Sequence, residues 1–187
     1  MKRKLILVAA ISAVILTAVY GTLAYFTAEG KTANVITAGN IKMALHQETA
    51  DGRPSLENVS GLMPGETVDR VVYVENTGDN AFYARVKLRS AVRAEDGTTL
   101  GADQISLDID TANWKLGADG WYYYQSAMDK GIVSKPLFKG IQFAPGMGND
   151  YMNANVIIEV VAQAVQCANN GDTVWQAAGW PAESAKG

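Results

Sequence analysis

The side chain best suited to acid–base or metal chemistry in this chain of 187 residues is its single histidine, His46. A hydrolytic triad needs a base beside its nucleophile, and a zinc site needs at least three protein ligands. His46 is not part of a His-Glu-x-x-His motif, and one cysteine, Cys167, cannot build a His/Cys zinc cluster within one chain. Because His46 alternates with apolar Leu45, the pattern places it on the solvated face of a strand. We predict no catalytic residue, no metal site and no cofactor.

Two further groups could bind a ligand. The carboxylates of Asp108 and Asp110 fall on one face of a predicted strand, where they could support glycoside hydrolysis or hold Ca²⁺. Both alternate with apolar Leu107 and Ile109, so the simpler interpretation is the solvated face of a half-exposed strand. The aromatic run at residues 121–124 could stack on sugars, or could pack its rings against the fold.

The first 24 residues have the pattern of an export signal. Three cations precede residues 5–20, which are 16 residues without a charge and would form a helix about 24 Å long. A bilayer core is roughly 30 Å thick, which favours a removable signal peptide over a permanent anchor. Thr22 and Ala24 are the small residues required before a cut between Ala24 and Tyr25. The membrane is then a partner only through the uncleaved signal peptide.

The exported part is acidic. Removal of residues 1–24 takes away three cations and no acids, so the formal charge falls from −3 to −6. Nucleic acid and anionic lipid attract clustered Lys and Arg, so neither is expected as a partner. The lone Cys167 excludes an intramolecular disulfide, which fits a Gram-positive secretory route. It is expected to be a small buried hydrophobe, with a disulfide between two chains as the alternative.

Alternation of apolar and polar residues dominates the rest of the chain. It predicts strands with one buried and one solvated face at residues 41–46, 68–74, 82–89, 105–109, 121–125 and 156–165. Turn residues at 63–66, 76–80 and 94–101 separate these strands. Seven or more short strands with regular turns indicate an all-β sandwich. Trp175 and Trp180 are expected to dock the polar tail, residues 169–187, on its body.

Seven segments resemble the TasA and camelysin (CalY) family, secreted biofilm matrix proteins of Gram-positive bacteria whose export depends on a SipW-type signal peptidase. They are residues 21–27, 37–41, 63–66, 74–78, 83–86, 120–124 and 162–166. The resemblance implies a jelly-roll-like antiparallel β-sandwich that assembles into extracellular fibres. In such fibres the N-terminal segment of one subunit enters the next as a strand. The implied partners are further copies of the chain, the SipW-type peptidase and related matrix proteins.

The residue patterns predict a signal peptide at 1–24, a β-sandwich at 41–168 and a tail at 169–187, and the resemblance adds a donor segment at 25–40. Val35 and Ile36, with Ile41 just beyond, are the candidate donor side chains. Strand addition draws its affinity from main-chain hydrogen bonds, and it needs an open sheet edge in the receiving subunit. Two alternatives stay open. The first is a metalloendopeptidase of camelysin type, since some members carry that name, and the second is a cell-surface carbohydrate-binding module that uses residues 121–124.

Overall fold

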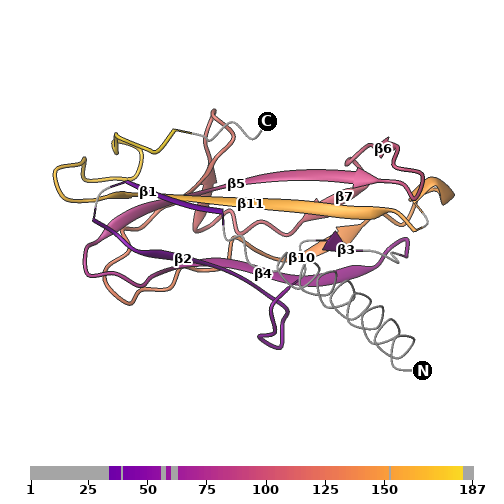
Figure 1. The fold of residues 1–187 in the computed structure, drawn as a ribbon, viewed down its shortest axis with the longest axis horizontal. Coiled ribbons are helices and arrows are strands. Elements are labelled where there is room, and N and C mark those ends of the chain that lie inside the picture. Colours follow the sequence, from indigo (N-terminus) through magenta and orange to yellow (C-terminus); the bar gives the residue numbers. More distant parts are fainter. Residues whose placement is uncertain (1–33, 39, 56–57, 60–62, 152, 183–187) are drawn as a thin grey trace, which may run out of the picture. The chain divides into compact units, whose positions relative to one another are not determined.

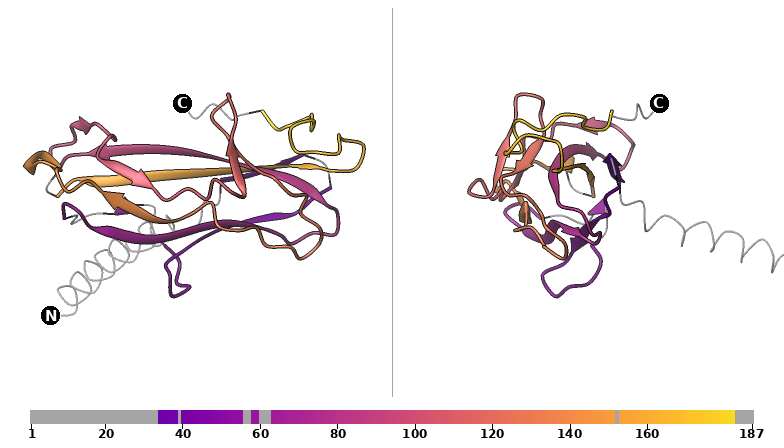
Figure 2. Two further views of the ribbon diagram at one scale, coloured as in Figure 1. Left: turned by 180° about the vertical axis from the view of Figure 1, so that it is seen from behind. Right: turned by 90° about the vertical axis from the view of Figure 1, so that its left-hand side faces the viewer.

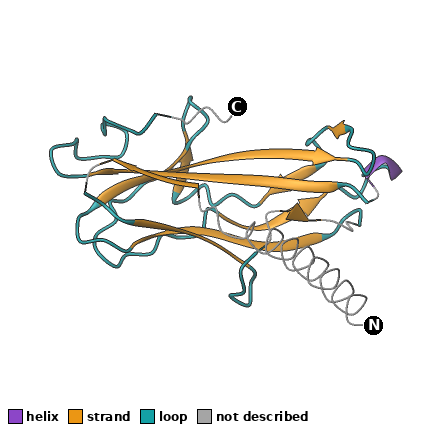
Figure 3. Ribbon diagram, in the orientation of Figure 1, coloured by secondary structure: helices purple, strands orange, loops and turns teal. Residues whose placement is uncertain are grey.

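Residues of alternating polarity form strands that are distributed over the described chain from residue 34 to residue 166 (Figure 3). The computed structural model describes residues 34–38, 40–55, 58–59, 63–151 and 153–182. The strands are β1 (Asn34–Ala38), β2 (Met43–Glu48), β3 (Asn58–Val59), β4 (Thr67–Asn76), β5 (Phe82–Arg93), β6 (Thr99–Leu100), β7 (Ile105–Leu107), β8 (Trp114–Leu116), β9 (Tyr122–Tyr124), β10 (Phe138–Phe143) and β11 (Asn155–Gln166), and η1 (Asn149–Tyr151) is one turn of 3₁₀ helix. The predicted all-β class is confirmed.

These strands make two sheets that lie one over the other (Figure 1, Figure 2). The larger sheet has the order β1-β11-β5-β9-β8, with β3 also paired to β11 and β6 to β5. The smaller sheet has the order β2-β4-β10-β7. Among the described strands, β1 with β11 is the one parallel pair, and the other pairs are antiparallel. β1 thus differs from the other described strands in the direction of its pairing, and it lies at an edge of the larger sheet.

The core lies between the sheets because the alternation turns one side chain in two inward. The predicted apolar face of β11 is confirmed: Val156, Ile158, Val160, Ala162 and Ala164 are each no more than 2% exposed. They belong to one cluster with inward residues of the smaller sheet, including Val72, Val74, Phe138 and Ile141. The structure also confirms the turn at Pro64, where Gly65 has a φ of 78° and Glu66 N donates to Met63 O.

Two strand predictions need correction. On β5 the face expected to be solvated carries Tyr83 and Arg85, which are only 5% and 8% exposed, because the C-terminal tail covers it. The strand expected at residues 105–109 ends at Leu107. Past that point the Asp108 carboxylate accepts bonds from Lys139 N and Gly140 N, and the chain leaves the smaller sheet for the larger one.

Some predictions fall outside the described residues. The signal peptide and the cleavage residues Thr22, Ala24 and Tyr25 lie there. Within the described part of the chain, no helix has the length and apolarity needed to cross a membrane.

Candidate functional site

The predicted donor segment contributes β1, which lies along the edge of β11 (Figure 1). Five consecutive residues pair in parallel, from Asn34 with Val161 to Ala38 with Val165. Val35 packs against the main core, whereas Thr37 is exposed. Ile41, the third candidate donor residue, lies past β1 and is buried in the core at 7% exposure. The segment is therefore held mainly by its backbone and by one inward side chain.

The edge of β11 has three different occupants along its length. β3 pairs with Val156 and Ile157, and β1 takes residues 161–165. Between them, Arg70 of β4 reaches across from the smaller sheet and donates from Nη2 to Ile158 O at 2.8 Å. The Arg70 side chain is almost fully buried, and its Nη2 also donates to Gln47 Oε1 at 2.5 Å. This arginine thus ties the two sheets together beside the β1 ladder.

Arg85 lies on the opposite, outer face of the larger sheet and is enclosed by aromatic rings. Its guanidinium carbon is 4.4 Å from the ring centroid of Trp121, 4.5 Å from that of Trp180 and 5.7 Å from that of Tyr123. Nε and Nη2 donate to Gln163 Oε1, at 3.0 and 2.7 Å, and Nη1 donates to the Tyr123 hydroxyl at 2.8 Å. Charge-assisted hydrogen bonds and cation–π contacts of this kind are strong when they are removed from water.

Asp119 completes the polar side of this arrangement. Its Oδ2 is 3.2 Å from Arg85 Nη1 and accepts a 2.7 Å bond from the Tyr123 hydroxyl. Partial burial raises the pKa of Asp119, but the Tyr123 hydroxyl, the Trp121 N–H and the Arg85 charge together hold it below its usual value. The carboxylate is therefore ionised where it faces the guanidinium.

The C-terminal tail, described over residues 169–182, covers this region (Figure 1, Figure 2). Val174 is 1% exposed against the sheet, and Trp175 packs on Tyr123 with ring centroids 4.7 Å apart and planes tilted by 35°. We call the resulting set the outer-face cluster: Tyr83, Arg85, Trp121, Tyr123, Gln163, Val165, Val174 and Trp180. The predicted docking of the tail by Trp175 and Trp180 is confirmed.

The outer-face cluster explains several sequence features. Trp121 and Tyr123 are buried beneath the tail, and Tyr124 is buried in the main core, so the aromatic run packs against the fold rather than forming an open platform for sugars. Cys167, which is half-buried, packs at the margin of the cluster, where burial raises the pKa of its thiol.

His46 lies on the outer face of the smaller sheet and stacks on Tyr73, with ring centroids 4.6 Å apart and planes 10° from parallel. Glu75 Oε2 is 2.8 Å from Nε2, and Glu48 Oε1 is 3.7 Å from Nδ1. The carboxylates thus approach opposite nitrogens of the ring and do not converge on one point. About 30% of each of the three side chains is exposed, as the alternation predicts.

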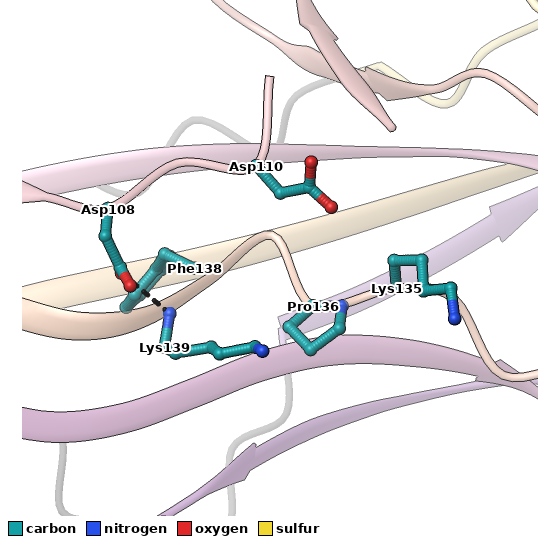
Figure 4. Close-up of a pocket in the computed structure, with 6 residues that line it drawn as sticks. All are labelled: Asp108, Asp110, Lys135, Pro136, Phe138 and Lys139. Carbon is teal, nitrogen blue, oxygen red and sulfur yellow. Dashed lines mark hydrogen bonds between the residues drawn. The ribbon is translucent and has the colours of Figure 1, made fainter. Parts of the chain in front are cut away.

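Asp108 and Asp110 line a hollow of about 290 Å³ with Lys135, Pro136, Phe138 and Lys139 (Figure 4). Asp108 Oδ1 accepts the Lys139 and Gly140 N–H groups at 2.8 and 2.7 Å. Asp110 accepts from Ala112 N at 3.0 Å and from Asn113 Nδ2 at 2.7 Å, and the Asn113 bond is the largest cause that lowers its pKa. Asp108 therefore binds the backbone of β10 where its register shifts, Asp110 caps the turn that follows it, and the two carboxylates do not act as a pair.

A family model described as camelysin metallo-endopeptidase matches residues 1–109. The chain belongs to the camelysin family. The match covers the donor segment and the strands through β7, and it stops before β11, Gln163 and the tail. Camelysin-family proteins are generally secreted or at the cell surface. No curated protein and no solved structure matches the chain.

The family description implies a metal ion, for which His46 and the two carboxylates beside it are the candidate ligands. Three convergent protein ligands are needed, but the two carboxylates beside His46 flank its ring instead of facing a common point. Across the described residues, no group of three or more His, Cys, Asp or Glu side chains is placed to hold a metal. The described side chains of this camelysin therefore do not fit a three-ligand zinc centre.

Sequence reasoning missed Arg70, Arg85 and Gln163. Gln163 gives a recognisable signal, because it is the one polar residue in the stretch from Val160 to Val165 of β11. Arg85 cannot be matched to it without the register of β5 against β11, which places the two residues directly opposite each other.

Proposed function

We propose that this camelysin is a secreted structural protein of the extracellular or biofilm matrix, with a jelly-roll-like sandwich, that assembles into fibres by strand exchange between subunits. The observation that carries the proposal is the parallel ladder of β1 on the edge of β11. A strand held at an edge by main-chain hydrogen bonds can be replaced by the same strand of another copy, because those bonds do not depend on which chain supplies them.

The way β1 is held supports exchange. Val35 is its contact with the main core, and its neighbour Thr37 is exposed. Loss of the strand would leave residues 161–165 of β11 with an open edge, and open edges pair with other strands. Cleavage after Ala24 would release the segment outside the cell, which would confine assembly to the matrix.

The first test compares two chains by electron microscopy and size-exclusion chromatography. The chain that begins at Tyr25 should form fibres, and the chain that begins at Asn40 should stay monomeric. A synthetic peptide of residues 25–40 should bind the shortened chain, because it supplies the missing strand. Equal polymerisation of both chains, or none by either, would contradict the proposal.

Neighbouring residues of β1 provide a matched control within the full mature chain. Val35→Asp places a charge against the core and should abolish fibres, because burial of an unpaired carboxylate is costly. Thr37→Asp makes the same chemical change at an exposed position, so it should leave fibres intact. Equal loss in both variants would show that charge, and not strand insertion, controls assembly.

The second candidate is a metalloendopeptidase of camelysin type, which the family description favours. His46, with Glu75 2.8 Å from Nε2, is the residue that such an activity would use. Cleavage of casein should then be lost with a chelator and with His46→Ala. Activity that survives both changes would remove this candidate, whereas activity lost in both would establish it.

A further inference from the structure

The ladder between β1 and β11 pairs unlike side chains. Three of its five rungs set a polar residue against an apolar one: Asn34 with Val161, Ile36 with Gln163, and Thr37 with Ala164. Neighbours on a sheet face usually match in polarity, because a buried polar group needs a hydrogen-bond partner. The chain's own strand is therefore a poor match for the edge that it covers.

Gln163 is where the mismatch matters most. Its side chain is fully buried, and its Oε1 is taken by two bonds from Arg85. The opposite end of the amide, Nε2, has no hydrogen-bond partner among the described residues. Since Arg85 donates, it fixes the orientation of the amide, and Nε2 must remain a donor. The residue across the ladder, Ile36, has no acceptor in its side chain.

A slide of β1 by two residues toward the C-terminal end of β11 would place each β1 residue from Asn34 to Thr37 opposite a residue of like polarity. A two-residue slide keeps every side chain on its own face, whereas a slide of one would exchange the faces. Asn34 would then stand opposite Gln163, and its amide oxygen could accept the Nε2 hydrogen bond. The other rungs of β1 would be Val35 with Ala164, Ile36 with Val165 and Thr37 with Gln166. The opposite slide would set Ala38 against Gln163 and offer no acceptor.

The chain cannot make this slide on itself. The connection from β1 to β2 is pinned at Asn40, whose carbonyl accepts from Asn80 Nδ2 at 2.7 Å, and at Lys42, whose carbonyl accepts from Thr77 N at 3.1 Å. Ile41 between them is buried. Two residues of strand are about 6.6 Å, which is more than this short connection can absorb. A strand from a second copy is not held by that connection.

We propose that β11 is a receptor for the β1 strand of a second copy of this chain, in a register two residues further along than the chain's own β1. Gln163 selects this register, because its Nε2 donates a hydrogen bond to the side-chain oxygen of Asn34 on the incoming strand. The inference rests on the proposed strand exchange and adds its register and its specificity residue. It also gives the exchanged pairing an advantage that the internal pairing lacks.

Disulfide trapping between two single-cysteine chains tests the register. In a Cys167→Ser background, chains with Ile36→Cys are mixed with chains carrying Val165→Cys, assembled and oxidised. The matched mixture uses Ala38→Cys with Val165→Cys, the rung of the internal register. Paired Cα atoms must lie within about 7 Å for a disulfide, and an offset of two residues exceeds that. The first mixture should give at least five-fold more cross-linked dimer than the second.

The outcomes separate the two proposals. If the mixture with Ala38→Cys cross-links more strongly in fibres, strand exchange stands and the shifted register is overturned. If the chain beginning at Tyr25 stays monomeric and neither mixture cross-links, strand exchange itself is overturned, and the register with it.

The variant Gln163→Glu tests the role of Gln163 separately, because it keeps the acceptor for Arg85 but removes the Nε2 donor. Fibre growth should slow at least three-fold in this variant, and unchanged growth would overturn the role of Gln163.

Discussion

The two end segments of the described chain, β1 and the C-terminal tail, both lie on the second half of β11. β1 lies along its edge and is held by a main-chain ladder, while the tail crosses the outer face and is held by side chains. The ladder could be made with any copy of the strand, whereas the contacts of Trp180 require Arg85 beneath it. One segment is therefore held in a way that is compatible with the proposed exchange, whereas the other is held by side chains of this sheet face.

The contrast between β1 and the tail requires that the tail is held through Arg85, so loss of this side chain should destabilise the folded protein. Arg85→Met removes bonds to Gln163, Asp119 and Tyr123 but keeps much of the apolar volume. We expect the free energy of unfolding to fall by about 3 kcal/mol, because buried partners lose a charged donor. Urea unfolding followed by tryptophan fluorescence would measure it.

Arg89 on the same strand is the matched control. Its side chain is 44% exposed, and its Nη1 is 3.6 Å from Glu159 Oε2. Because exposed pairs contribute little, Arg89→Met should cost less than about 1 kcal/mol. Equal losses in the two variants would mean that the enclosure of Arg85 adds no stability.

A smaller effect is expected from the tail itself. Trp180→Ala removes one of the two indoles on Arg85 and should lower the free energy of unfolding by about 1–2 kcal/mol. It should also make the tail sensitive to proteinase K, while the assembly of fibres through β1 continues. Trp175→Ala is the control, since Trp175 is 52% exposed and should matter less. Fibres lost together with the tail would show that the two segments are not independent.

Much of the fold could be predicted from the sequence, because alternation reports which face of a strand is buried. The strand at 156–165 was predicted in this way, and the turn at Pro64 was predicted from the Pro-Gly pair. Alternation cannot report what later covers an outer face, so Arg85 was expected in solvent although it is buried. It also cannot show where a carboxylate ends a strand, as Asp108 does after Leu107.

The candidate site was less predictable, since its parts meet only through register. The candidate donor residues Val35 and Ile36 were proposed through family resemblance, and the structure places Val35 against the core and Ile36 opposite Gln163. Gln163 lies between Ile36 on β1 and Arg85 on β5. This placement follows from the registers of β1 and β5 against β11, which the spacing of residues in the sequence does not show.

The smallest expected effect is a pH dependence confined to the tail. The pKa of Asp119 is lowered in the folded protein, so its contribution is fully present above its unfolded value, about 3.9, and is lost as pH falls through the folded pKa. Its side chain is 45% exposed, which limits the contribution to a few tenths of a kcal/mol.

Residues 34–38 carry no titratable side chain, so the β1 ladder should not respond in this range. The sensitivity of the tail to pepsin should therefore rise as the pH falls below about 3.9 in the wild type, and Asp119→Asn should flatten that rise. Asp79→Asn, which removes a carboxylate paired with Lys130 away from the tail, should leave it unchanged. An equal response of fibre assembly would mean that the edge and the outer face of β11 are coupled.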